Sequence, residues 1–107
     1  PQVWYLDLFA GKNDHEAVRR AGESGHKEIN RTNLSTDQIA EDLKKDVVQK
    51  QLALIRMRNT HKAFSEGAEV AISGGESSLQ IRWEYNSAFA TLNVNFESGT
   101  YTIVESR

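Results

Sequence analysis

The side chain best suited to chemistry in this sequence is an arginine in a glycine-containing stretch. Arg31 ends the segment GHKEINR. Its guanidinium carries a planar fork of donors that can bind sugar hydroxyls or a phosphate. The same group could instead form a salt bridge that holds the loop to a barrel or a helix. Residue type and position therefore leave two roles open for Arg31, ligand contact and loop anchor.

Other groups give weaker signals for a site. No HExxH or comparable metal-ligand spacing occurs, and the chain has no cysteine. The GxSxG, Walker and GxGxxG patterns are also absent. We therefore expect no metal site and no nucleotide cofactor, and we expect the three histidines to lie on the surface or in loops (His15, His26 and His61).

Two aromatic residues and one carboxylate have a structural and a functional interpretation. Trp83 and Tyr85 could stack on the face of a sugar. Both share the apolar phase of an alternating segment, which favours a place in the core. Asp14 lies in the turn GKND, where an aspartate typically caps the turn.

The composition is that of a folded protein without a strong charge bias. Of 107 residues, 38% are hydrophobic and 26% are charged, with 13 basic against 15 acidic residues and a net charge of −2. This balance argues against binding to nucleic acid or to an anionic membrane. No apolar run approaches the roughly 18 residues that span a bilayer. The length suits one domain or a piece of a larger one.

The first element is an apolar run from Val3 to Phe9, which we interpret as a strand. It shows little alternation, as is typical of a strand buried on both faces of a parallel sheet. Such a strand needs parallel neighbours, and the sequence offers no second α/β unit. We therefore expect this chain to have been cut from something longer. The alternative is an edge strand of a small α+β domain.

A long loop and a helical segment follow. Residues 12–34 are polar and rich in glycine, with one or two helical turns expected at 15–20. Ser35 followed three residues later by Gln38 is a capping-box pattern, which predicts a helix start. Apolar residues then recur at mostly helical spacing to about Asn59, namely Ile39, Leu43, Val47, Leu52 and Ile55. A break between a shorter and a longer helix is expected near Asp46-Val47-Val48.

From Gly67 onward, the hydrophobic period changes to two. Four alternating runs are separated by turn residues at 74–78, 86–87 and 98–99. This pattern predicts a four-stranded antiparallel meander with one buried apolar face and one polar face.

Three segments resemble the C-terminal end of the sucrose phosphorylases of glycoside hydrolase family 13. They are PQVWYLDLFAGKND, EINR and the helix from STDQIAEDLKK to NTHKAF. The resemblance implies an α/β parent protein. Residues 1–64 would be the last strand, active-site loop and closing helix of a (β/α)8 barrel, and residues 65–107 a small antiparallel β domain.

The resemblance also implies an activity. The family transfers a glucosyl group from sucrose or a related α-glucoside to phosphate, with retention of configuration. Arg31 would contact the glucosyl unit. The nucleophile and the acid/base would lie outside this chain, and Asp7, Asp14 and Glu28 should not be assigned their roles. No cofactor is implied beyond inorganic phosphate as co-substrate. The implied partners are sugar, phosphate and the remainder of the barrel, with a homodimer also allowed and the cytoplasm as location.

Two departures from the family pattern leave the acceptor open. Asp7 stands where a small residue is usual, and Thr32-Asn33-Leu34 follow the INR motif where histidine and aromatic residues are common. Fructose, fructose 6-phosphate, glycerol and glycerate all remain candidates. A stand-alone, non-catalytic α+β module that binds carbohydrate or a partner is the alternative function. We also expect the chain alone to associate with itself through the unpaired edge of its first strand.

Overall fold

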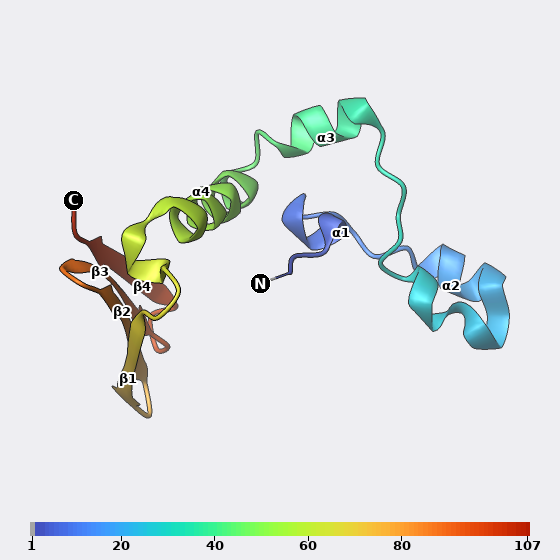
Figure 1. Ribbon diagram of the computed structural model, residues 1–107. Helices are drawn as coiled ribbons and strands as arrows, with labels where there is room; N and C mark the ends of the chain where they lie inside the picture. Colours follow the sequence, from blue (N-terminus) through green and yellow to red (C-terminus); the bar gives the residue numbers. More distant parts are fainter. Residues whose placement is uncertain (1) are drawn as a thin grey trace. The chain divides into compact units, whose positions relative to one another are not determined.

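The computed structural model describes residues 2–107, which form two compact units (Figure 1). The first unit extends to Ile55 and the second begins at Arg56. The first contains α1 (Tyr5–Leu8), α2 (His15–Ala21), the 3-10 helix η1 (Gly22–Glu28), α3 (Thr36–Asp42) and the beginning of α4 (Asp46–Thr60). The second contains the end of α4, the 3-10 helix η2 (Lys62–Phe64) and strands β1 (Glu69–Gly75), β2 (Ser78–Tyr85), β3 (Ala88–Asn95) and β4 (Thr100–Glu105). The domain boundary expected at 64/65 concerns the parent protein and stays a prediction.

The strand predicted for residues 3–9 is wrong, because this segment forms the single-turn helix α1. The amide of Leu8 donates to the Trp4 carbonyl at 2.9 Å, and that of Phe9 donates to the Tyr5 carbonyl at 3.1 Å. Leu6, at 2% exposure, is the buried residue of the turn. An apolar run that does not alternate with polar residues is compatible with a helix or a strand. Within residues 2–107 no strand pairs with this segment, so its amides bond within the turn.

The stretch 12–34 is more regular than its composition predicts. The helical turns expected at 15–20 are confirmed as α2, whose C-cap is Gly22 with φ of +67°. Residues 22–28, predicted as a loop, form η1. Gly25 is buried there, and an added Cβ would lie 2.5 Å from the Val18 carbonyl oxygen. This close approach packs η1 against α2.

The predicted helix start at Ser35 is confirmed. The Ser35 hydroxyl accepts a hydrogen bond from the Gln38 amide at 3.1 Å, which caps α3. The expected break between two helices is present, but it lies at residues 43–45, just before Asp46-Val47-Val48, which begin α4. The predicted apolar stripe is not a buried core, since Leu43 and Val47 are 36% and 51% exposed and its other members are half-buried. The fully buried residue of α4 is Val48, beside the stripe.

The four predicted strands are confirmed and form one antiparallel sheet in the order β1-β2-β3-β4. The pairing register places the alternating apolar residues on the same face, for example Ile72 opposite Ile81 and Leu92 opposite Ile103. The prediction that this face is buried is only partly correct. η2 contacts β2 and β3, and the ring of Phe64 lies 5.3 Å from that of Trp83. Toward β1 the face is open, with Ile72 at 69% exposure.

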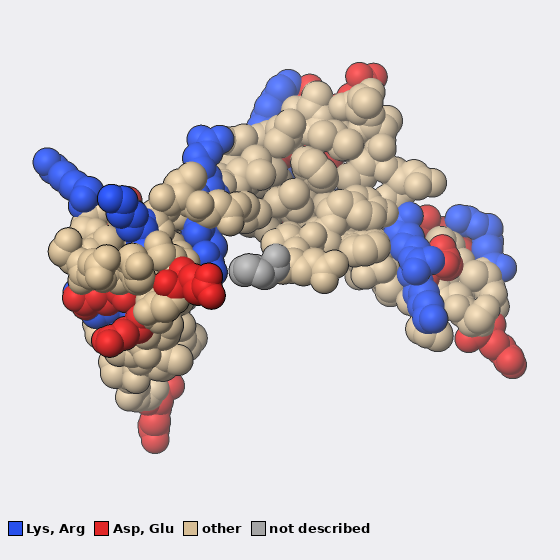
Figure 2. All heavy atoms as spheres, in the orientation of Figure 1, with Lys and Arg blue, Asp and Glu red and all other residues tan. Residues whose placement is uncertain are grey.

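Acidic and basic side chains are interspersed on the face drawn in Figure 2. Both kinds lie side by side there, with uncharged surface between them. This distribution agrees with the near-balanced net charge of −2. None of the helices within residues 2–107 is both long and apolar enough to cross a membrane.

Candidate functional site

Arg31 lies directly after the loop structure formed by α2 and η1. Its guanidinium Nη1 is 3.3 Å from Glu28 Oε1, and the two side chains are 53% and 42% exposed. The partner is the last residue of η1, three residues earlier, so this ion pair is local and does not tie Arg31 to an element distant in sequence. An exposed pair of this kind contributes little to stability. The guanidinium is therefore accessible to a ligand.

A surface pocket of about 340 Å³ contains Arg31 in its wall. Its wall also contains the ammonium group of Lys27, the imidazole of His26 and the indole of Trp4. The remaining lining residues are Ile29 and Asn30. The donors in this wall suit hydroxyl groups or an anion. The indole adds an apolar surface of the kind on which a sugar ring packs. Of the residues predicted from the sequence, the pocket brings together Arg31 and His26.

The backbone on both sides of Arg31 is bonded to the N-terminal segment of the chain. Trp4 Nε1 donates to the Asn30 carbonyl at 2.7 Å, and the Tyr5 hydroxyl donates to the Thr32 carbonyl at 2.9 Å. The loop is also closed at its base, where the Asp14 amide donates to the Ile29 carbonyl at 2.7 Å. These bonds connect residues 15 to 27 positions apart in sequence.

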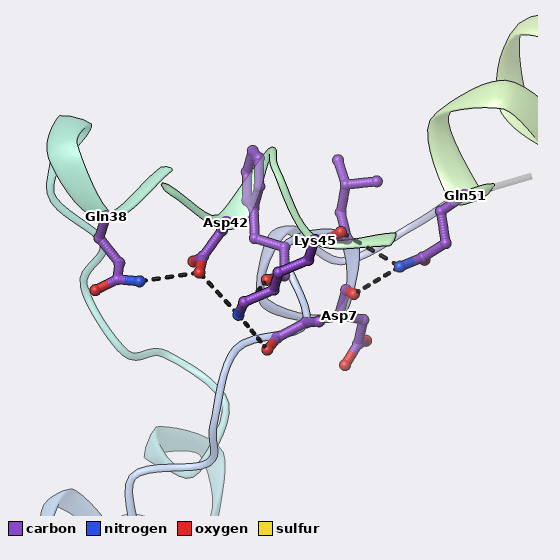
Figure 3. Close-up of polar contacts among 8 residues, drawn as sticks. Asp7, Gln38, Asp42, Lys45 and Gln51 are labelled. Carbon is purple, nitrogen blue, oxygen red and sulfur yellow. Dashed lines mark hydrogen bonds and ion pairs between the residues drawn. The ribbon is translucent and has the colours of Figure 1, made fainter. Parts of the chain in front are cut away.

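A polar cluster from α3, α4 and the short link between them holds the end of α1 and the two residues after it (Figure 3). Lys45 Nζ lies 2.8 Å from Asp42 Oδ1 and donates to the carbonyls of Ala10 at 3.1 Å and Phe9 at 3.4 Å. Gln51 Nε2 donates to the carbonyls of Asp7 at 3.2 Å and Leu8 at 3.3 Å. The last carbonyls of a helix lack partners within it. Here Gln51 of α4 bonds the last two carbonyls of α1, and Lys45, in the link between α3 and α4, bonds the next two.

Asp42 is the buried charge of this cluster, at 2% exposure. Its carboxylate accepts hydrogen bonds from Lys45 and from Gln38 Nε2, the latter at 2.9 Å. The Lys45 hydrogen bond, reinforced by the Gln38 bond, lowers the pKa of Asp42 below its ordinary value of 3.8, and burial opposes this change only in part. Asp42 is therefore held as a carboxylate.

The remaining candidates have structural roles. Asp14 accepts from the Ala17 amide at 2.9 Å and caps α2, as predicted. His61 bonds the Ser106 carbonyl through Nε2 at 2.9 Å and accepts from the Ala63 amide through Nδ1 at 3.2 Å. Trp83 is half-buried against Phe64, which agrees with a core role and leaves less of its ring for a sugar. Within residues 2–107, no three His, Asp or Glu side chains lie where they could hold one metal ion.

Several residues of the site were missed in the sequence. Asp42 and Lys45 stand three residues apart, and Gln38 and Asp42 four apart, which are spacings that bring helical side chains together. These spacings in the sequence could therefore have predicted the cluster around Asp42. Trp4 and Tyr5 gave no such signal, because their partners lie 26 and 27 residues away.

The chain matches the C-terminal part of a class of phosphorylases that act on glucosides. It is 48% identical over 103 residues to a sucrose 6(F)-phosphate phosphorylase of Ilumatobacter coccineus, which covers 96% of this chain and 20% of that protein. It is 39% identical over 106 residues to a sucrose phosphorylase of Agrobacterium vitis, covering 99% of this chain and 21% of the relative. A glucosylglycerol phosphorylase of Marinobacter adhaerens is 36% identical over 110 residues, with 99% and 22% covered. No protein-family model matches the sequence.

The same relationship holds in three dimensions. The crystal structure of a sucrose 6F-phosphate phosphorylase from Thermoanaerobacter thermosaccharolyticum superposes with a TM-score of 0.89 at 36% identity, covering 100% of this chain and 21% of that one. The chain spans about one fifth of the length of the curated relatives it matches. It is the counterpart of the C-terminal part of the sucrose and sucrose 6(F)-phosphate phosphorylases, which confirms the resemblance read from its motifs.

Proposed function

We propose that this chain is the C-terminal part of a retaining glucoside phosphorylase. The whole protein transfers a glucosyl group from sucrose or a related α-glucoside to inorganic phosphate, which gives α-glucose 1-phosphate. The observation that carries this proposal is the 48% identity to a sucrose 6(F)-phosphate phosphorylase over 96% of the chain. The chain contributes the segment that follows the last barrel strand, with Arg31 as contact to the glucosyl unit.

Retaining transfer to phosphate takes two steps. A carboxylate attacks the anomeric carbon while an acid protonates the departing oxygen, and phosphate then displaces the carboxylate. The two carboxyl groups must stand about 5–5.5 Å apart. In this proposal both belong to the rest of the protein. Asp14 is used as a helix cap and Glu28 as the ion-pair partner of Arg31.

Arg31 supplies positive, directional hydrogen-bond donors beside the sugar. The exposure of its guanidinium and its place in the pocket with Trp4 support this role. No cofactor is required besides phosphate as co-substrate. In this proposal the remainder of the barrel belongs to the same polypeptide as this chain. The whole protein is placed in the cytoplasm, and it is allowed to form a homodimer.

The test is an assay of the whole protein with sucrose, sucrose 6-phosphate and glucosylglycerol, each with phosphate. We expect α-glucose 1-phosphate from at least one donor, and none from residues 1–107 alone. Arg31→Gln should lower kcat/KM by about 10- to 100-fold, the effect of one lost hydrogen bond from a charged group. Absence of product with all three donors would refute the proposal.

A further inference from the structure

The side chain of Arg31 is weakly held, whereas its backbone is firmly held. Within residues 2–107, the side chain of Arg31 pairs with Glu28 alone, in an exposed ion pair at 3.3 Å. An exposed ion pair of this length does not fix a long, flexible side chain. The direction in which the guanidinium enters the pocket therefore depends on the path of the backbone through residues 30–32.

Two adjacent aromatic residues bond that backbone on either side of Arg31. Trp4 bonds the carbonyl of Asn30 at 2.7 Å, and Tyr5 bonds the carbonyl of Thr32 at 2.9 Å. The carbonyls before and after Arg31 are thus both tied to one short segment. The two rings contact each other, with centroids 5.1 Å apart, which restricts their own movement.

The segment that carries these two aromatics is itself anchored. Leu6 is buried, Gln51 bonds the last carbonyl of α1, and Lys45 bonds the carbonyl of Ala10 just after it. Trp4 precedes α1 and Tyr5 is its first residue. A donor on a rigid base sets the position of its acceptor more closely than a donor on a mobile one.

We propose that Trp4 and Tyr5 are positioning residues for Arg31. They hold the peptide units on both sides of it so that its guanidinium enters the pocket in the orientation that a bound glucosyl unit requires. This inference rests on the proposed function. It adds two residues, neither a catalytic group, to the determinants of substrate binding.

The test is a double-mutant cycle in the whole protein, assayed with the donor on which it is active. Tyr5→Phe removes only the hydroxyl, and Trp4→Phe removes the indole N–H while keeping an aromatic ring. Each should lower kcat/KM by roughly fivefold to tenfold, the range for one lost hydrogen bond. In an Arg31→Gln background the same substitutions should have almost no further effect, because the group that they position is gone.

The matched control is Tyr101→Phe, which removes the hydroxyl of an exposed tyrosine in β4 and should leave kcat/KM unchanged. Thermal unfolding of each variant reports any loss of fold. Full additivity with Arg31→Gln, or wild-type activity in both Tyr5→Phe and Trp4→Phe, would overturn the inference while the proposed function stands. A wild-type protein that makes no α-glucose 1-phosphate would refute the function, and the inference with it.

Discussion

Lys45 Nζ lies 2.8 Å from a carboxylate oxygen of Asp42, whose side chain is 2% exposed. The same ammonium also donates to the carbonyls of Ala10 and Phe9. One lysine thereby neutralises a buried charge and bonds the two carbonyls that directly follow α1. This arrangement links the helices α3 and α4 to the segment that holds the backbone around Arg31.

Removing the ammonium should destabilise the protein. Lys45→Met keeps most of the side-chain volume but leaves Asp42 charged, buried and without its cation, which is a costly arrangement. We expect a clear drop in the midpoint of thermal unfolding. Lys44→Met is the matched control, because Lys44 pairs with Glu41 at the same spacing and both of those side chains are 69% exposed. An equal effect of the two substitutions would contradict a special role for Lys45.

The Asp42 carboxylate predicts a pH dependence of stability at acid pH. Its pKa in the folded state lies below the ordinary value of 3.8. A group whose pKa is lowered on folding stabilises the fold above the unfolded pKa, and this contribution is lost as the pH falls through the folded one. Unfolding followed from pH 6 to pH 2 should show a loss of stability below about pH 4. This loss should be smaller in Asp42→Asn, which cannot titrate.

His61 is predicted to stabilise the second unit through both ring nitrogens. Nδ1 caps η2 through the Ala63 amide, and Nε2 bonds the Ser106 carbonyl. His61→Ala loses both bonds and should lower the free energy of unfolding by about 1–3 kcal/mol. His61→Asn should recover part of that loss because asparagine is a good helix cap. Chemical denaturation measures both, and equal losses would argue against the cap.

Gly25 is predicted to tolerate no side chain. A Cβ would lie 2.5 Å from the Val18 carbonyl oxygen, which is backbone and cannot move without shifting α2. Gly25→Ala should lower the free energy of unfolding by about 1–3 kcal/mol, as overpacking does. Gly75→Ala is the control, because its nearest atom would be Ser78 Oγ at 4.0 Å. If both variants unfold at the wild-type denaturant concentration, the close contact at Gly25 is not rigid.

The chain expressed alone should associate with itself, but not through an unpaired first strand, since that strand is absent. The open part of the apolar sheet face is the expected contact, because large exposed apolar patches favour association. Ile72, on this face, is 69% exposed, and Val104, on the opposite face, is 53% exposed. Sedimentation velocity should show less association for Ile72→Lys than for Val104→Lys. A monomeric wild-type chain would contradict the prediction.

Local elements of the fold were predictable from the sequence because their causes are local. The hydroxyl of Ser35 caps α3 through an amide three residues away, so sequence spacing reveals it. The hairpins follow from period-two alternation and from turn residues such as Asn86, whose φ is +54°. The motif around Arg31 led to the sucrose phosphorylase resemblance, which the comparisons confirm.

Tertiary structure decided the features that depend on distant partners. In the described part of the chain no strand pairs with residues 3–9, which form a helical turn instead. Lys45 and Gln51, more than 34 residues later, donate hydrogen bonds to carbonyls at its end. The bonds from Trp4 and Tyr5 to residues 30 and 32 are equally remote in sequence. Side-chain periodicity reports only which faces are apolar, whereas hydrogen-bond partners and burial depend on which elements the folded chain brings together.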